Sequence, residues 1–298
     1  MHYDVIIVGG SFAGLAAAIY LGRARRFACV IDTRRPRNRF AKESHGFFAQ
    51  DGREPGTILD TMRWQISAYP TVHFINDAAI DARSDGGDVK VALAGGQIVA
   101  GSRLLLAFGV SDILPDIPGL SDRWGRTVLH CPYCHGYEVS GQRLGVLNVS
   151  TASLQQALLV SDWGPTTFFT NGADLNGPGL EQLQRRNIEI ERDPVAGLVG
   201  EQPMLSAVRF KDGRLRPLDA LFISPQVALN SGIADQIGCE LRNGPVGPFI
   251  AVDGTMMTTV QDVYAAGDIA RASHNITFAC ADGVAAAMAI HRSLVLQS

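Results

Sequence analysis

The sequence predicts an α/β protein in which two doubly wound, nucleotide-binding halves share one chain. Near the amino terminus an apolar strand, a glycine-containing turn and an alanine-rich helix precede a second strand that ends on an acidic residue. The same strand–helix–strand order starts again at residue 143. Near the carboxyl end the chain returns to one more strand and an apolar helix. At 298 residues it is long enough for two domains, each with its own core.

The composition narrows the class of protein. Hydrophobic residues make up 46% and charged residues 18%, as in a compact soluble protein. The formal net charge of -3 offers no basic surface for nucleic acid. We find no apolar run of the roughly eighteen residues that a membrane span needs, so no membrane association is expected. The chain enters its first strand without a signal-like segment, and a cytoplasmic location is therefore the expectation.

The first turn has the pattern of a phosphate-binding loop. We expect a strand over 3–8, a helix over 15–23 and a strand over 28–31. Gly9 and Gly14 occupy the first and third glycine positions, and Ser11 takes the second. Such a turn brings backbone amides and a helix amino terminus to a pyrophosphate, and Asp32 stands where an acid binds ribose hydroxyls. The alternative is a tight turn in an α/β protein that binds no nucleotide.

Further along, the sequence predicts an arginine-rich loop over 33–42, an amphipathic helix over 56–69 and a meander of alternating segments over 72–99. A buried strand over 104–107 and a proline- and glycine-containing linker over 113–119 follow. The second half has strands over 143–147 and 166–170 around a helix over 153–161, and it ends near 222–226. A strand over 263–266 and a helix over 281–294 complete the chain.

The carboxyl-terminal strand ends in a second nucleotide-type signal, Ala265-Ala266-Gly267-Asp268. An aspartate at the end of such a strand can contact the ribityl or pyrophosphate part of a long dinucleotide. The alternative is that Asp268 caps the following helix. Together with the amino-terminal turn, this segment favours a flavin over a nicotinamide.

Five cysteines include one close pair, Cys131-Pro132-Tyr133-Cys134. An odd number of scattered cysteines is not a structural disulfide framework, so the pair is a redox-centre candidate. Metal binding is the alternative, because His130 and His135 flank the pair. Ligands crowded on one short turn cannot easily surround an ion, and a second CxxC is absent. The other three, Cys29, Cys239 and Cys280, are interpreted as small buried hydrophobes.

In order and spacing these motifs resemble the low-molecular-weight thioredoxin reductases over essentially the whole chain. The resemblance implies two Rossmann-like nucleotide-binding domains of three-layer ββα type. It implies a discontinuous FAD-binding domain (1–114 and 228–298), an inserted NADPH-type domain (115–227) that carries the CxxC pair, and a homodimer. It also implies that Cys131 exchanges with the substrate and that Cys134 faces the flavin.

The same resemblance implies a set of cofactor-binding positions spread over both ends of the chain. They are Gly9, Ser11, Phe12, Ala13, Gly14, Asp32, Arg39, Ala107, Gly109, Gly267, Asp268, His274, Asn275 and Ile276. His274 and Asn275 stand where the family usually shows Arg-Gln, beside the flavin pyrimidine ring.

Two departures concern the inserted domain. A typical member has Gly-x-Gly-x-x-Ala there, whereas this chain has Asn148-Val149-Ser150-Thr151-Ala152-Ser153. The arginine-rich stretch that clasps the 2′-phosphate of NADPH is replaced by residues 170–174, which contain no cation. Both changes predict poor use of NADPH.

The third departure is His135, where thioredoxin reductases usually carry an aspartate. Residues 131–138, and the stretch 37–52, are similar to the branch of dithiol oxidases that close disulfides in gliotoxin- and holomycin-type metabolites. In that branch molecular oxygen reoxidises the flavin. His135 is the first candidate for the base that deprotonates a dithiol, and His130 is the second, with His45 and His274 as outside candidates.

Three functions stay open from the sequence. The first is an FAD- and O2-dependent oxidase of a small-molecule or peptide dithiol. The second is a disulfide reductase for a thioredoxin-like protein, fed by ferredoxin, another flavoprotein or weakly bound NAD(P)H. The third is a non-enzymatic redox sensor with a structural FAD, which has no need of the intact cysteine pair.

Overall fold

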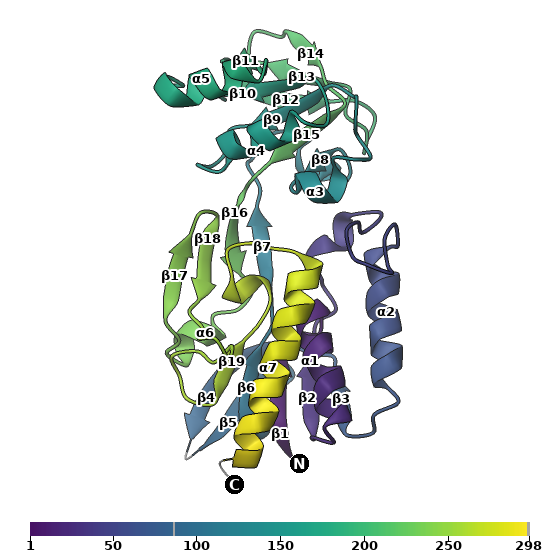
Figure 1. Cartoon of the computed structure of the whole chain (residues 1–298), viewed down its shortest axis with the longest axis vertical. Coiled ribbons are helices and arrows are strands. Elements are labelled where there is room, and N and C mark those ends of the chain that lie inside the picture. Colours follow the sequence, from purple (N-terminus) through teal and green to yellow (C-terminus); the bar gives the residue numbers. More distant parts are fainter. Residues whose placement is uncertain (86, 297–298) are drawn as a thin grey trace. The chain divides into compact units, whose positions relative to one another are not determined.

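The computed structural model describes residues 1–85 and 87–296. By internal contacts the chain divides into two compact units (Figure 1). Unit 1 comprises residues 1–37, 56–111 and 227 onward, and unit 2 comprises residues 38–55 and 112–226. The sequence-based boundaries lie close to these, but they assign 38–55 to the first domain. The contacts group this loop with unit 2, where Gly125 lies directly against the backbone of Phe40.

Unit 1 is built on a seven-stranded sheet of order β3-β2-β1-β6-β5-β4, in which β19 also pairs with β6. Its parallel strands are β1 (His2–Val8), β2 (Ala28–Ile31), β3 (Val72–Ile75), β6 (Ile98–Leu106) and β19 (Val263–Ala265). The other two strands join through antiparallel pairs: β5 (Asp88–Leu93) pairs with β6, and β4 (Ala79–Asp85) pairs with β5. The order reverses between β1 and β6, so the loops that leave their carboxyl ends frame a crevice for a ligand.

The prediction of an antiparallel meander over 72–99 is wrong for the first strand of that segment, β3. β3 pairs parallel to β2, and the antiparallel run consists of β4, β5 and β6. The predicted strand over 104–107 is the end of β6, which starts at Ile98. An edge strand of a parallel sheet is half-buried and shows the same alternation as a hairpin strand, so the pattern does not separate the two.

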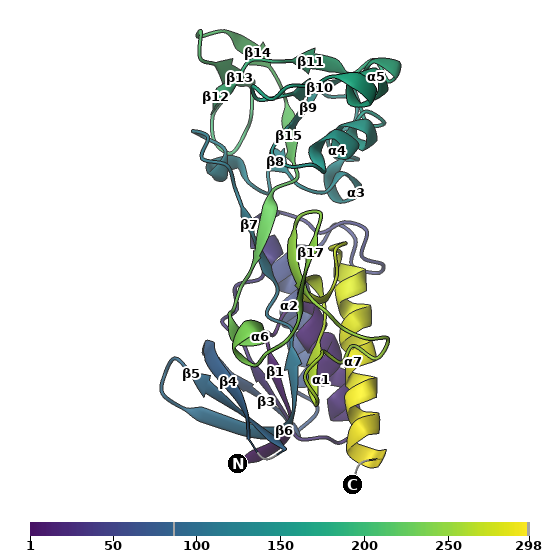
Figure 2. The same cartoon turned by 90° about the vertical axis from the view of Figure 1, so that its left-hand side faces the viewer.

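Helices cover one face of this sheet: α1 (Phe12–Arg23), α2 (Pro55–Ile66) and α7 (Ile276–Leu296). The views in Figures 1 and 2 both show α1 and α7 side by side. A Cβ on Gly283 of α7 would lie 2.1 Å from the carbonyl oxygen of Ala13, so glycine permits this close approach. α7 begins five residues before the predicted start, because Asn275 Oδ1 accepts a 2.8 Å hydrogen bond from Thr277 N and caps the helix.

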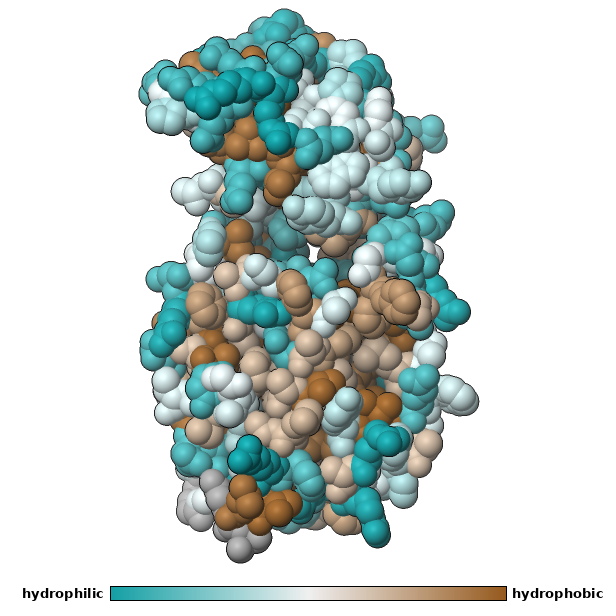
Figure 3. All heavy atoms as spheres, viewed as in Figure 1, coloured by the Kyte–Doolittle hydropathy of each residue, from teal (hydrophilic) through white to brown (hydrophobic). Residues whose placement is uncertain are grey.

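α7 corrects the expectation about apolar runs, because by length and composition it could cross a membrane. Alanine contributes much of that apolar character. The helix packs along α1 and buries Ala279, Ala286, Ala287 and Ile290, as a core helix of a globular unit does. Figure 3 shows apolar side chains gathered on the surface over this part of unit 1, where Met288 is exposed.

Smaller elements complete unit 1 on the opposite face of the sheet. They are α6 (Ile233–Gln236), the hairpin of β17 (Leu241–Gly244) with β18 (Gly247–Ile250), and the single turn η3 (Asp268–Ala270). Ile233 and Ile250 join the same apolar core as Ile6 and Leu104 of the sheet. The segments that run between the units, β7 (Val110–Ile113) and β16 (Gln226–Leu229), pair with each other.

Unit 2 has the predicted three-layer ββα architecture. Its parallel sheet, in the order β11-β10-β9-β15-β8, consists of β8 (Val128–Leu129), β9 (Leu144–Leu147), β10 (Thr166–Phe169), β11 (Glu189–Glu191) and β15 (Ala220–Ile223). One face carries α4 (Ser153–Val160) and α5 (Gly177–Arg185). The other carries an antiparallel sheet of β12 (Val195–Val199), β13 (Ala207–Phe210) and β14 (Leu215–Pro217).

The alternation of side chains along the central strands explains these layers. Phe168 packs toward α4 and α5, whereas the next residue, Phe169, packs against Phe210 of the antiparallel sheet. Successive side chains of a strand point to opposite faces, so a strand that is apolar throughout needs cover on both sides. The remaining short elements are η1 (Arg37–Phe40), η2 (Ser121–Arg123) and α3 (Pro132–His135).

Candidate active site

The first nucleotide loop lies at the carboxyl end of β1. Gly9 N donates a 2.8 Å hydrogen bond to Ile31 O, which fixes the start of the loop beside β2. Gly9 has a φ of +109°, and a Cβ there would lie 2.2 Å from the carbonyl oxygen of Ala107. Only glycine meets both conditions, so the loop approaches the end of β6 at the crevice between β1 and β6.

The amino terminus of α1 continues this loop and suits an anion. Ser11 is the N-cap, its side chain makes no capping hydrogen bond, and the first turn of the helix contains no acidic residue. Phe12, Ala13 and Gly14 form that first turn. Because the helix dipole is not neutralised there by its own side chains, this end of α1 can receive a pyrophosphate.

Asp32 stands directly after β2 and is held by an arginine that the sequence did not single out. Arg63 of α2 places Nη2 2.6 Å from Asp32 Oδ2 and 2.7 Å from Gly10 O. Less than a fifth of either side chain is exposed. The pair orients the carboxylate beside the glycine loop. Nothing in the local sequence marked Arg63, because its partners lie 31 and 53 residues away.

The carboxyl-terminal candidates are joined through Arg37. Its Nη1 lies 3.1 Å from Asp268 Oδ2 and donates to His274 Nδ1 at 2.8 Å. Two predicted cofactor-binding residues therefore share one guanidinium, which the sequence did not assign to the site. The side-chain oxygen of Asn275 caps α7. If Asn275 contacts a cofactor, we therefore expect its side-chain nitrogen to make the contact.

The other predicted cofactor-binding residues divide between the units. Ala107 and Gly109 follow β6, and Gly267 follows β19, so all three lie at the carboxyl edge of the sheet in unit 1. Arg39 is grouped with unit 2 and is exposed, with its guanidinium 4.2 Å from the centre of the Phe40 ring. The loop, the helix end and the acid of unit 1 fit a dinucleotide such as FAD. The individual contacts to it stay predictions.

The cysteine pair lies on the single turn α3, directly after β8. Cys131 is the N-cap, Pro132 follows it, and Cys134 N donates to Cys131 O at 3.2 Å. Both residues are partly exposed. Gln156 of α4 donates from Nε2 to His130 O at 2.6 Å and so anchors the residue before Cys131. Among the described residues, no group of three or more His, Cys, Asp or Glu side chains is arranged to hold a metal ion.

His135 is the partly buried histidine at the end of α3. Burial lowers its pKa, with a smaller opposing effect from the Glu138 carboxylate and a smaller lowering effect from His45. A lowered pKa keeps the imidazole neutral near pH 7, the form that accepts a proton. His45 lies in the same unit, and its Nε2 is 3.5 Å from Glu138 Oε1. The sequence predicted His135 as the base, but it did not pair Glu138 with either histidine.

The remaining cysteines are poor nucleophiles. Burial raises the pKa of the Cys29 and Cys280 thiols to about 11. Burial also raises the pKa of Cys239. Because the thiolate is the reactive form, these three side chains are largely inert near neutral pH.

The second nucleotide loop, after β9, has the same topology as the first but is closed by its own side chains. Asn148 N donates to Phe169 O at 2.9 Å, as Gly9 N does to Ile31 O. Ser153 Oγ accepts hydrogen bonds from Val149 N at 3.0 Å and from Ser150 N at 3.1 Å. These are the amides that a phosphate would take.

The hydroxyl of Ser150 closes the loop further, because it donates to Ser224 O after β15 at 2.7 Å. The second loop also lacks the acidic residue that Asp32 provides in the first. Thr170 N donates to Glu191 O as Asp32 N does to Ile75 O, and Thr170 is fully buried with no acid to offer a ribose. The two halves thus share a topology but differ in the groups that would bind a nucleotide.

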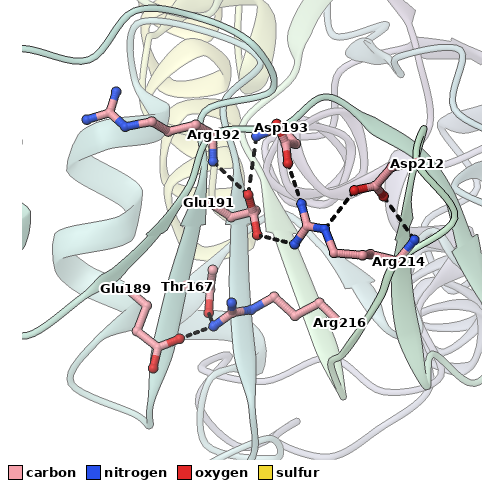
Figure 4. Close-up of polar contacts among 8 residues, drawn as sticks. All are labelled: Thr167, Glu189, Glu191, Arg192, Asp193, Asp212, Arg214 and Arg216. Atoms are coloured by element: carbon pink, nitrogen blue, oxygen red, sulfur yellow. Dashed lines mark hydrogen bonds and ion pairs between the residues drawn. The ribbon is translucent and has the colours of Figure 1, made fainter.

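Arginines near this edge of unit 2 are engaged with carboxylates (Figure 4). Arg214 of the β13–β14 hairpin pairs with Asp212 at 2.8 Å, with Glu191 at 3.3 Å and with Asp193. Arg216 pairs with Glu189 and donates to Thr167 Oγ1 at 3.0 Å. The side chain of Arg192 points away from this network in Figure 4. None of these arginines lies in the segment 170–174, where typical family members carry the clasp for a 2′-phosphate and where the sequence of this chain has no cation.

A dinucleotide loop of the flavin type and a CxxC pair together define a flavoprotein thiol–disulfide oxidoreductase. The comparison with known families agrees with this class. The chain belongs to the pyridine nucleotide-disulphide oxidoreductase family, whose model matches residues 3–147 and 177–283. The family and its thioredoxin reductase members are FAD-binding flavoproteins, so FAD is the cofactor expected of unit 1.

Individual relatives place the chain near a particular branch. It is 31% identical over 280 residues to thioredoxin reductase tcpT of Claviceps purpurea, covering 89% of this chain and 86% of the relative. It is 28% identical over 310 residues to thioredoxin reductase sirT of Leptosphaeria maculans, covering 97% and 93%. These matches support the resemblance to the gliotoxin-type branch.

Among solved structures, an oxidoreductase from Agrobacterium tumefaciens superposes with a TM-score of 0.95 at 40% identity, and both chains are covered completely. The structure of HlmI has a TM-score of 0.94 at 34% identity, covering 99% of this chain and 93% of that one. The discontinuous FAD domain and the three-layer arrangement predicted from the sequence are therefore confirmed as a thioredoxin reductase-like fold.

Proposed function

We propose that the protein is an FAD-dependent dithiol oxidase, which converts a small-molecule or peptide dithiol to a disulfide and passes the electrons to molecular oxygen. The observation that carries this proposal is the contrast between the two nucleotide loops. In unit 1 the N-cap Ser11 makes no side-chain capping hydrogen bond and the first turn of α1 carries no acidic residue, whereas in unit 2 Ser153 Oγ takes two loop amides. An enzyme that receives electrons from its substrate does not need the second site.

The residues of α3 supply the substrate chemistry. His135 takes the proton from one substrate thiol, and the resulting thiolate attacks Cys131 of the oxidised pair. The Cys131–Cys134 bond breaks, and a substrate–Cys131 disulfide forms. The second substrate thiol gives its proton to water, and its sulfur attacks the substrate sulfur of the mixed disulfide. The Cys131 thiolate leaves, and the product disulfide is released. The substrate has lost two electrons and two protons, and both cysteines are reduced.

FAD, when bound, would accept that electron pair and pass it to O2, which is thereby reduced to hydrogen peroxide. Cys134 is the thiol proposed to face the flavin, and Cys131 the one proposed to face the substrate. Gln156 anchors the backbone carbonyl of His130, the residue before Cys131, with a 2.6 Å hydrogen bond.

The test is anaerobic reduction of the bound flavin, followed by its visible absorbance. Dithiothreitol, the probe dithiol, is expected to bleach the wild-type flavin rapidly, whereas NADPH leaves it oxidised. Cys134→Ser should retain the yellow colour and lose dithiol-driven oxygen uptake. Cys239→Ser, at a buried thiol remote in sequence from the pair, is the matched control and should keep it. Rapid bleaching by NADPH but not by dithiothreitol would refute the oxidase, and persistent uptake in Cys134→Ser would exclude the cysteine pair.

A second candidate is a thioredoxin reductase-type enzyme that runs in the opposite direction. The names of the relatives tcpT and sirT favour it. It would take electrons from ferredoxin, another flavoprotein or NAD(P)H and reduce a thioredoxin-like disulfide. Turnover of oxidised thioredoxin with any of these donors, at a rate above that of dithiol oxidation, would favour this direction.

A further inference from the structure

The cysteine pair lies on a helix that is too short to hold its own shape. α3 spans only Pro132–His135, with Cys131 as its N-cap. A single helical turn fixes several backbone dihedrals for very few hydrogen bonds, so it is unstable by itself. Residues three apart in such a turn lie on the same face, which lets the side chains of Cys131 and Cys134 meet. Contacts from outside the turn must therefore keep this geometry.

α4 holds the start of the turn through Gln156. The Nε2 of Gln156 donates to His130 O at 2.6 Å, and the residue is only 6% exposed. Its Oε1 is buried, and no described residue donates a hydrogen bond to it. Burial of an acceptor without a donor costs free energy, which an apolar side chain of similar size would avoid. The bond to His130 O is therefore the contact that explains a polar residue at this place.

The indole of Trp163, in the turn after α4, contacts the other end of the cysteine turn. A Cβ on Gly136 would lie 2.7 Å from Trp163 Cδ2 and 2.6 Å from Pro132 O. Gly136 has φ −64° and ψ −33°, which any residue adopts, so glycine is needed there for space. The ring of Tyr133 lies edge-on to the same indole, with the ring centroids 5.9 Å apart. Trp163 thus contacts residues on both sides of Cys134.

The position of Trp163 is itself fixed. Its backbone N donates to Val160 O at 3.0 Å. Its carbonyl oxygen accepts hydrogen bonds from Gly141 N at 2.7 Å and from Ser140 Oγ at 3.2 Å. The side chain packs against the apolar core of unit 2 that includes Leu129 of β8. Because β8 leads directly into the cysteine turn, the same core supports both the turn and the indole that contacts it.

We propose that Gln156 and Trp163 are positioning residues of the redox pair. They hold the two ends of the turn, so that the sulfur atoms of Cys131 and Cys134 stay within bonding reach when the pair is reduced. The disulfide then forms without a rearrangement of the backbone. The inference rests on the part of the proposed function in which these two cysteines form and break a disulfide, and it does not depend on what reoxidises the flavin.

The two contacts act more on the dithiol than on the disulfide. In the disulfide the covalent bond itself restricts the turn, whereas the reduced turn takes up other conformations once a contact is removed. Loss of a contact therefore favours the dithiol, and the reduction potential of the pair becomes less negative. Loss of one neutral hydrogen bond changes an equilibrium constant by about three- to tenfold. A tenfold change is about 30 mV in the potential of a two-electron couple.

The experiment equilibrates the FAD-loaded protein anaerobically with mixtures of reduced and oxidised glutathione, extended at the reducing end with dithiothreitol. Glutathione disulfide takes two electrons and two protons from the cysteines, which form their own disulfide, and becomes two glutathione thiols. Alkylation of the remaining thiols and mass spectrometry of the cysteine peptide give the oxidised fraction at each ratio. These fractions yield the equilibrium constant for formation of the Cys131–Cys134 disulfide.

Gln156→Met removes the hydrogen-bond donor at nearly constant volume and should lower this equilibrium constant by about three- to tenfold. Gln155→Met, at the exposed neighbouring position of α4, is the matched control and should leave it unchanged. The free energy of unfolding should change little in Gln156→Met, because the unpaired buried oxygen is removed together with the bond. A merely structural role would lower the stability and leave the equilibrium constant unchanged.

Gly136→Ala tests the second contact, because the new Cβ would push the turn away from the indole of Trp163. The equilibrium constant should fall, as in Gln156→Met. The helical backbone angles at this position suit alanine, so a change cannot come from a strained φ. Gly254→Ala is the control, since a Cβ there would meet no described atom within 4 Å, and it should leave the equilibrium constant unchanged.

Two results would overturn the inference while the proposed function stands. One is an unchanged equilibrium constant in both Gln156→Met and Gly136→Ala, with a normal wild-type pair. The other is a shift toward the disulfide in either variant. If the wild-type pair forms no disulfide at any ratio, these cysteines are not the redox pair, and the proposed function itself fails. If Gly136→Ala does not fold, the comparison of Gln156→Met with Gln155→Met decides the question.

Discussion

Replacing Ser153 by alanine tests the central observation, which is that the second nucleotide loop is closed by its own hydroxyl group. Ser153 is fully buried, and its Oγ accepts hydrogen bonds from Val149 N and Ser150 N. The substitution removes the acceptor and leaves two backbone donors without a partner. The loop backbone should then loosen, and unit 2 should lose stability.

The magnitude follows from these two bonds. A buried donor left without an acceptor costs about 1–3 kcal/mol, and the low end applies because Val149 and Ser150 are partly exposed and water can reach them. Two donors therefore cost about 2 kcal/mol. Ser153 is the first residue of α4, and the higher helix propensity of alanine offsets up to about 0.5 kcal/mol. The expected net loss in the free energy of unfolding is about 1.5 kcal/mol.

Urea unfolding followed by tryptophan fluorescence measures this loss, because two of the three tryptophans, Trp124 and Trp163, lie in unit 2. Thr151→Ala, at an exposed position of the same loop, is the control and should change the free energy of unfolding by less than about 0.5 kcal/mol. If Ser153→Ala is as stable as the wild type, Ser153 does not anchor the loop, and the reason given for poor use of NADPH is wrong.

Three further predictions concern the flavin loop and the thiols. Gly9→Ala should abolish FAD retention, since the new Cβ would lie 2.2 Å from Ala107 O; a yellow protein with one flavin per chain would contradict this. Because burial lowers the pKa of His135, the acidic half-maximum of dithiol-driven bleaching should lie below about pH 6.5, with the rate falling as pH drops through it and the base becomes protonated. Iodoacetamide near neutral pH should label the reduced CxxC pair and leave Cys29 and Cys280 unmodified, and mass spectrometry of the peptides checks this.

Much of the fold was predictable because its signals are local. Gly9, Asp32 and Asp268 each follow a strand at a fixed offset, and β1, β2, β9, β10 and β19 were predicted to within a residue or two of their observed ends. The strand order was harder to predict. β3 and β4 have similar alternation, but only their partners decide that one is parallel and the other antiparallel.

The sequence predicted those parts of the candidate site that lie within single short motifs. The CxxC pair, His135 and the glycine-poor second loop are each visible in a short stretch of residues. The sequence did not predict a role for Arg63 or Arg37, because the carboxylates that they contact are distant in the sequence.

The sequence by itself determined which chemistry is present: a dinucleotide turn, a redox-capable thiol pair and a degenerate second turn. These depend on the residue types and on spacings of a few residues, which the chain carries whether or not it is folded. Tertiary structure alone decided how those groups are held and balanced. In the folded chain Ser153 Oγ accepts hydrogen bonds from two backbone amides, and Glu138 lies beside His45, which is 93 residues earlier in the sequence. Hydrogen bonds and charges act over a few ångströms of space, so these contacts do not depend on the distance along the chain.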